Sequence, residues 1–138
     1  METKEDYAAA ASRHLIDARL LAAESRWDNA LYLSGYTAEC SLKAVVERAG
    51  IGARGFSHKL NDLHGPALEL AATMAPATAR YRPPDLAVEW FSTNWQPSLR
   101  YSPDIASDRV VLEAVTEAGR IFDSTIAAMR LDGLLPWT

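Results

Sequence analysis

The chain has 138 residues, of which 49% are hydrophobic and 23% are charged, and its formal net charge is -4. This length suits one domain with one core, and the composition is that of a globular protein, which excludes a disordered chain. The acidic balance excludes a strongly basic nucleic-acid-binding protein but is compatible with a local basic patch. The single cysteine, Cys40, excludes an internal disulfide and a cysteine-based zinc site, and we expect its side chain to be buried in a helix.

The first residues, METKEDY, lack the basic start and the long apolar run of a signal peptide. No stretch of the chain reaches the roughly 20 apolar residues that a membrane-spanning helix needs. We therefore predict one soluble domain over residues 1–138, located in the cytoplasm and not in a membrane.

Apolar residues recur at helical spacing along nearly the whole chain, which predicts an all-α fold. The first predicted helix covers residues 4–25 and the second covers residues 28–49. Gly35 lies inside the second helix, where a glycine favours close approach of a neighbouring helix. Gly50 follows in the position of a C-terminal cap.

A third predicted helix runs over residues 58–74, starts after a Ser57 cap and bends near Gly65-Pro66. Residues 75–84 hold three prolines and are expected to form a connection. A short helix over residues 85–95 follows. The last helix is expected to start at Ser102-Pro103-Asp104, a capping serine, a proline and an acid, and to end near residue 130.

Five amphipathic helices with short connections predict an up-and-down antiparallel helical bundle. In such a bundle the loop between the second and third helices and the loop between the fourth and fifth helices lie at the same end.

Positive charge is concentrated in the loops of this acidic chain. No carboxylate occurs between Arg48 and Asn61, and the next loop holds Arg100 without an acid from Trp90 to Pro103. We predict that a phosphate or another anion binds where these loops meet, aided by the start of the third helix. The loop residues assigned to this site are Arg54, His58, Lys59, Arg100 and Tyr101, and Glu39 and Lys43 of the second helix complete the seven residues of the predicted binding site. The alternative interpretation is that they are solvated cations that balance acidic helix faces.

Two aromatic residues, Trp95 and Tyr101, flank the later loop. They are placed either to stack on a base or to pack under the end of the bundle.

Glu39 and Lys43 are four residues apart on the second predicted helix, in the order that favours an ion pair. One interpretation is an ion pair on the helix surface, and the other is a polar pair that lines a cleft at the bundle end. Because the neighbours of Glu39 on its helix face are apolar, its carboxylate needs a cation, and Arg100 is a candidate.

The second helix contains Gly35-Tyr36-Thr37-Ala38-Glu39-Cys40-Ser41-Leu42-Lys43-Ala44, which resembles the GYxxExxLKA pattern in the second helix of HEPN-domain proteins. Ser57-His58-Lys59-Leu60 resembles the family's THxL start of the next helix, and Arg100-Tyr101 resembles the RY segment before the last helix. The resemblance covers about residues 5 to 130. It implies a HEPN-like helical bundle, a homodimer, and either a nucleotidyltransferase partner in a toxin–antitoxin pair or a metal-independent RNase.

One departure from the family pattern bears on catalysis. The family's nuclease motif is an arginine followed four to six residues later by a histidine, near the start of the last helix. All three histidines here, His14, His58 and His64, precede Arg100. A histidine is needed there for proton transfer. We therefore predict a catalytically inactive HEPN-like binding module for a nucleotide, RNA or a nucleotidyltransferase, with a role in a toxin–antitoxin or stress-response pair.

Two alternatives remain open. The first is a metal-independent RNase with a rearranged site, in which Arg54 or Arg100 neutralises phosphate charge and His58 is the base. The second is a purely structural interaction protein. No metal-ligand triad, phosphate-binding loop or dinucleotide fingerprint occurs, so we expect no metal and no cofactor.

Overall fold

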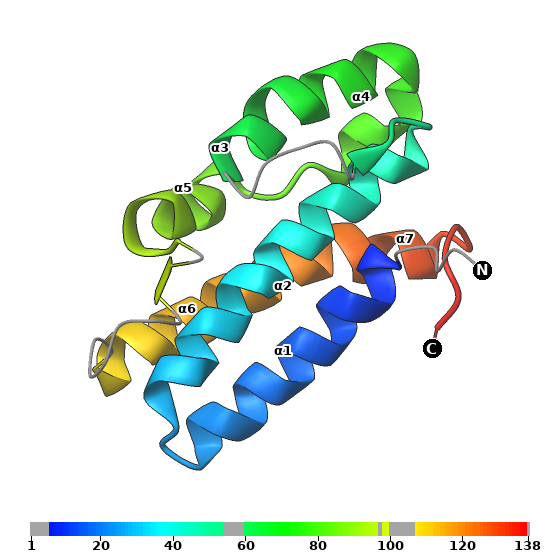
Figure 1. Ribbon diagram of the computed structural model, residues 1–138. Helices are drawn as coiled ribbons and strands as arrows, with labels where there is room; N and C mark the ends of the chain where they lie inside the picture. The colour runs from blue at the N-terminus through cyan, green and yellow to red at the C-terminus, as the bar shows by residue number, and fades with distance from the viewer. Residues whose placement is uncertain (1–5, 54–59, 97, 100–106, 138) are drawn as a thin grey trace, which may run out of the picture.

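The computed structural model describes residues 6–53, 60–96, 98–99 and 107–137, and its regular elements are all helical (Figure 1). The α-helices are α1 (Tyr7–Ala23), α2 (Trp27–Arg48), α3 (Leu60–Asp62), α4 (Leu68–Met74), α5 (Asp85–Asn94), α6 (Asp108–Phe122) and α7 (Ala128–Leu131). Two π-helical turns, Leu63–Ala67 and Asp123–Ala127, join α3 to α4 and α6 to α7. The predicted all-α bundle is therefore confirmed, and its five predicted segments correspond to α1, α2, α3–α4, α5 and α6–α7.

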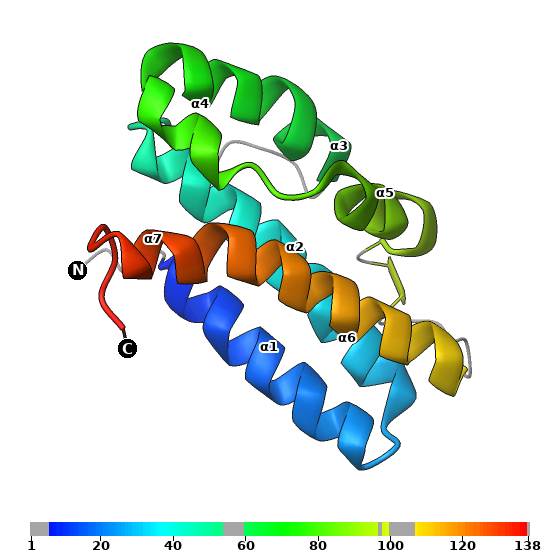
Figure 2. The same cartoon turned by 180° about the vertical axis from the view of Figure 1, so that it is seen from behind.

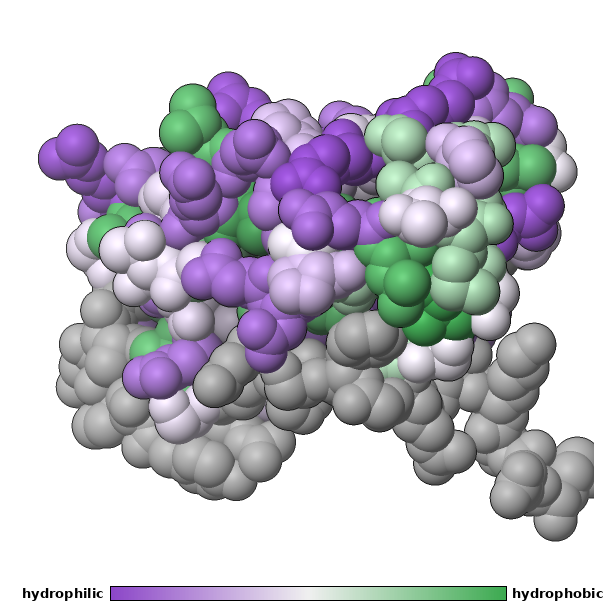
Figure 3. Space-filling model, turned by 90° about the horizontal axis from the view of Figure 1, so that it is seen from above, coloured by the Kyte–Doolittle hydropathy of each residue, from purple (hydrophilic) through white to green (hydrophobic). Residues whose placement is uncertain are grey.

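Helix α2 is the central element of the bundle. Helix α1 packs antiparallel to it, and α6 packs against both α1 and α2 on the far side in Figure 1 and the near side in Figure 2. The α3–α4 segment and α5 cover the remaining side of α2. The surface seen from above mixes hydrophilic and hydrophobic residues (Figure 3). Helices α2 and α6 run in the same direction (Figures 1 and 2), which differs from a strict up-and-down order because α5 leads back to the start of α2.

The placement of the connections differs from the sequence-based expectation. Helix α2 ends at Arg48, but Trp95, which follows α5, donates from Nε1 to the carbonyl oxygen of Tyr32 near the start of α2 (3.2 Å). The loop after α2 and the loop after α5 therefore begin near different ends of α2. The prediction that these two loops lie at the same end of the bundle is wrong for the residues with which they begin. The third segment nevertheless starts beside α5, since Ser92 Oγ donates to Asn61 Oδ1 (2.8 Å).

Gly35 lets the Trp95 ring lie directly on α2. A Cβ atom at Gly35 would lie 1.9 Å from Trp95 Cε2, a distance that no packed structure accommodates. The close approach predicted at this glycine is thus made by one indole ring and not by a whole helix. The side chain of Trp95 is buried, with a relative exposure of 7% for the residue.

Each π-helical turn contains a local feature that is known to bend helices. Pro66 lies inside the first turn, as the predicted bend required, because proline has no N–H to donate and its ring crowds the carbonyl four residues earlier. In the second turn Thr125 Oγ1 donates to the carbonyl oxygen of Ile121 (2.7 Å). Such hydroxyl contacts with the preceding turn bend helices.

Several predicted boundaries change. The last helix starts after Ser107, whose Oγ accepts from the Val110 N–H (3.3 Å). The predicted start at Ser102 is therefore wrong for this helix, and Ser102 itself lies outside the described residues, as does the Ser57 cap. The segment expected to be only a connection contains a 3₁₀ helix, Pro76–Tyr81. Gly50 has φ +86°, as the predicted cap requires, and Cys40 is buried as expected.

None of the helices in the described part of the chain combines the length and apolar character needed to cross a membrane.

Candidate functional site

The candidate site centres on Glu39 and Lys43 in the middle of α2. Lys43 Nζ lies 3.4 Å from Glu39 Oε2, and the two residues are only 5% and 3% exposed. The ion pair considered from the sequence is therefore present, but its expected position on the helix surface is wrong, because neighbouring elements, α1 among them, cover this face of α2. Burying two charges costs several kcal/mol per ion before their attraction is counted, so the pair adds little net stability.

Side chains from α1 complete the surroundings of the pair. Lys43 Nζ lies 5.5 Å from the centre of the Tyr7 ring, a cation–π contact. His14, seven residues after Tyr7 in α1, is half-buried, and the centre of its ring lies 6.0 Å from the centre of the Tyr36 ring. Burial lowers the pKa of His14 below its usual value of 6.5, Arg13 lowers it further, and Asp17 and Glu39 oppose the shift. The neutral imidazole is therefore favoured, and it can both donate and accept a hydrogen bond.

An aromatic cluster lies next to His14. Tyr36 makes edge contacts with Tyr32 and Trp95, with ring centres 4.9 and 5.1 Å away. Because Trp95 is buried and packed on Gly35, it serves the second of the two roles considered for it, packing under the bundle. Its ring is not available to stack on a base.

A surface hollow of about 410 Å³ opens at the other end of the α1–α2 pair. It is bordered by Tyr7, whose ring contacts Lys43, by Ala44, which follows Lys43 in the chain, and by Leu135 from the C-terminal segment. The charged residues at its rim are Asp6, Glu47 and Arg48. Two carboxylates beside one guanidinium do not make a site that attracts an anion.

Five of the seven predicted site residues lie outside the described residues: Arg54, His58, Lys59, Arg100 and Tyr101. The structure brings together the other two, Glu39 and Lys43. Asn61, two residues after Lys59, accepts a hydrogen bond from Ser92 in α5, eight residues before Arg100.

Sequence reasoning missed His14 and Tyr7 as neighbours of the buried pair. They are seven residues apart in α1, a spacing that places both on one helix face. The spacing alone places the two side chains only on a common face of their own helix. The contact with α2 depends on the relative position of the two helices, which the spacing does not give.

Within the described ranges no group of three histidine, cysteine, aspartate or glutamate side chains is placed to hold a metal ion. Comparisons with protein-family models, with curated proteins and with solved structures each give no match.

Proposed function

We propose that this chain is a catalytically inactive HEPN-like binding module that binds the phosphate of a nucleotide or RNA. The observation that carries the proposal is the buried Glu39–Lys43 pair, since it lies within the segment of α2 that resembles the HEPN pattern. The bundle does not need this pair for stability, because apolar residues of similar volume usually serve a core as well or better. A charged pair kept at this cost supports a role in binding.

Phosphate binding is assigned to the basic loop residues predicted from the sequence, Arg54, His58, Lys59, Arg100 and Tyr101. Asn61, which follows the first basic segment, is in contact with Ser92 of α5, which supports a location of that segment near α5.

The test is a titration with ATP and, separately, with a short single-stranded RNA. Arg100→Ala and His58→Ala should each weaken binding about tenfold or more, since each removes one charge-assisted contact with a phosphate. Arg109→Ala is the matched control, because this arginine of α6 is almost fully exposed and is paired with Glu113 (3.5 Å). Absence of binding to both ligands, or equal weakening by Arg109→Ala, would contradict the proposal.

A metal-free RNA cleavage assay separates binding from catalysis. We expect wild type, His58→Ala and Arg100→Ala to give the same background-level cleavage. Cleavage by the wild type that disappears in His58→Ala would establish the RNase alternative instead. If Arg100→Ala lowers stability but leaves nucleotide binding unchanged, the purely structural alternative is favoured.

We further propose that the module is a homodimer and that its protein partner is a nucleotidyltransferase in a toxin–antitoxin pair. Light scattering during size-exclusion chromatography measures the molar mass in solution, and the mass of a monomer at micromolar concentration would refute the homodimer. The proposed partner is tested by co-purification with a nucleotidyltransferase whose gene lies beside the gene of this chain. Failure of the two proteins to co-purify would refute the partnership.

A further inference from the structure

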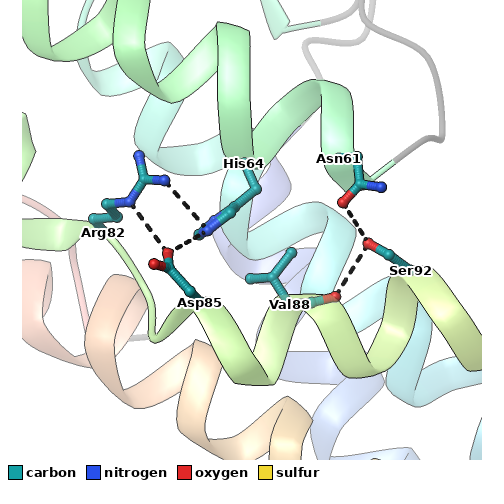
Figure 4. Close-up of polar contacts among 6 residues, drawn as sticks. All are labelled: Asn61, His64, Arg82, Asp85, Val88 and Ser92. Carbon is teal, nitrogen blue, oxygen red and sulfur yellow. Dashed lines mark hydrogen bonds and ion pairs between the residues drawn. The ribbon is translucent and has the colours of Figure 1, made fainter.

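A second polar cluster lies on the side of the bundle formed by the α3–α4 segment and α5 (Figure 4). His64 comes from the π-helical turn, Arg82 from the extended residues before α5, and Asp85 from the first turn of α5. His64 Nε2 lies 2.7 Å from Asp85 Oδ1, and Arg82 Nε lies 3.5 Å from the same oxygen. One carboxylate oxygen is thus shared by an imidazole and a guanidinium.

The proton on His64 can be placed from these contacts. Nδ1 is buried and has no hydrogen-bond partner among the described residues, whereas Nε2 faces the carboxylate. A carboxylate accepts hydrogen bonds, so Nε2 of His64 carries a hydrogen. The ring therefore donates from Nε2 towards the carboxylate of Asp85.

Arg82 points a donor at the same position. Its Nη2 lies 3.4 Å from His64 Nε2, and a guanidinium can only donate. Two donors this close do not bond to each other, and an anion beside them is what makes the arrangement favourable. In this structure the carboxylate of Asp85 is that anion.

We propose that Arg82 and His64 form a binding site for a phosphate group, in which the Asp85 carboxylate is an internal occupant that an incoming phosphate displaces. The site is separate in residues from the one proposed above and does not depend on it. The side chain of Asp85 is 68% exposed and that of Arg82 is 41% exposed, so an anion in solution reaches both.

Two further features favour an anion here. Helix α5 begins at Asp85 without a side-chain cap from Pro84, so the partial positive charge of its N-terminus is not offset by a capping side chain. The hydrogen bond from His64 is the main cause that lowers the pKa of the Asp85 carboxyl below its usual value, with the charges of His64 and Arg82 acting in the same direction. Both indicate a local preference for negative charge.

A phosphate monoester fits this site better than a second carboxylate, because it carries more negative charge and presents three terminal oxygens, where a carboxylate presents two, to the donors of Arg82 and His64. The internal carboxylate competes at high effective concentration, since it is tethered three residues from Arg82. We therefore expect weak phosphate binding by the wild type and tighter binding once the carboxylate is removed.

The test follows the imidazole signals of His64 by NMR while inorganic phosphate is added to wild type, Asp85→Ala and Asp85→Asn. Asp85→Ala should bind inorganic phosphate at least about tenfold more tightly than the wild type, since a competing charge is removed. Glu89→Ala is the matched control, because it removes the same charge from an exposed position one turn along α5. Titration with AMP and with a short single-stranded RNA then distinguishes a free phosphate, a nucleotide and an RNA backbone as the source of the group.

The gain should disappear in the double variant Asp85→Ala/Arg82→Gln. No gain in Asp85→Ala, or an equal gain in Glu89→Ala, would overturn the proposal. Should circular dichroism show that Asp85→Ala does not fold, Asp85→Asn provides the comparison, because it keeps the shape of the side chain and removes its charge. The response of His64 separates this site from one at Arg100, so the two proposals can fail independently.

Discussion

Replacing Gly35 by alanine should destabilise the bundle, although alanine is the better helix former. A Cβ atom there would lie 1.9, 2.1 and 2.2 Å from three atoms of the Trp95 indole, so the whole ring must move by more than 1 Å. The ring is buried and cannot move freely. Overpacking of this kind costs about 1–3 kcal/mol.

The movement of Trp95 also breaks its other contacts. Its hydrogen bond to the Tyr32 carbonyl is worth about 1 kcal/mol, and its edge contact with Tyr36 contributes about 0.5–1.5 kcal/mol. The higher helix propensity of alanine returns about 1 kcal/mol. We therefore expect Gly35→Ala to lower the free energy of unfolding by about 2–4 kcal/mol, measured by urea denaturation followed by circular dichroism.

Two controls make this prediction specific. Gly65→Ala changes a helical glycine whose Cβ would meet nothing within 4 Å, so the free energy of unfolding should stay the same or rise slightly. In a Trp95→Ala background the clash is absent, and Gly35→Ala should become neutral or stabilising. If Gly35→Ala is equally costly in both backgrounds, or costs nothing in the wild type, the role assigned to Trp95 is refuted.

Three further changes test the polar contacts. Glu39→Gln leaves the buried Lys43 ammonium without its carboxylate and should lower the free energy of unfolding by about 3–5 kcal/mol in urea denaturation. The double variant Glu39→Leu/Lys43→Met should recover most of that loss. A loss below about 1 kcal/mol in the single variant would contradict the burial of the pair. Tyr81→Phe removes the 2.5 Å bond to Asp132 and should cost about 1 kcal/mol at neutral pH. The hydrogen bond to Asp132 raises the pKa of Tyr81 above its ordinary value of 10.0. The bond therefore stabilises the folded state fully below about pH 10, and this stabilisation is lost as the pH rises through the pKa of Tyr81 in the folded state. The difference in stability between wild type and Tyr81→Phe should accordingly shrink in alkali. Because His64 lowers the pKa of Asp85, the wild type should lose more stability than Asp85→Asn as the pH falls below the ordinary value of 3.8; parallel acid denaturation curves would exclude this.

The helices could be predicted because each carries its own apolar stripe, a property of local spacing. The start of the last helix could not, because Ser102-Pro103-Asp104 and Ser107-Asp108 are both good local start signals, and only the second begins the observed helix. Likewise, Gly35 signals a close approach, but its partner Trp95 is 60 residues away in the chain. No spacing rule connects two such positions.

The same limit applies to the polar clusters. The i,i+4 pair Glu39–Lys43 could be predicted, since both residues belong to one helix, but its burial could not, because it depends on how α1 covers α2. His64 and Asp85 are 21 residues apart, and the bend at Pro66 and the turn before α5 decide that they meet. Contacts across two connections of this kind are set by tertiary packing.

The burial pattern also separates the fold-related residues from the binding-related residues in the α2 segment whose sequence resembles the HEPN pattern. Gly35, Leu42 and Ala44 have packing roles that any bundle of this shape would require of α2. A likeness carried by such positions indicates an arrangement of helices and no particular ligand. Glu39 and Lys43 are different, because a core made of apolar residues would be at least as stable without them. The binding hypothesis therefore depends on these two residues, and a Glu39→Leu/Lys43→Met variant that folds but no longer binds phosphate ligands would separate the two contributions.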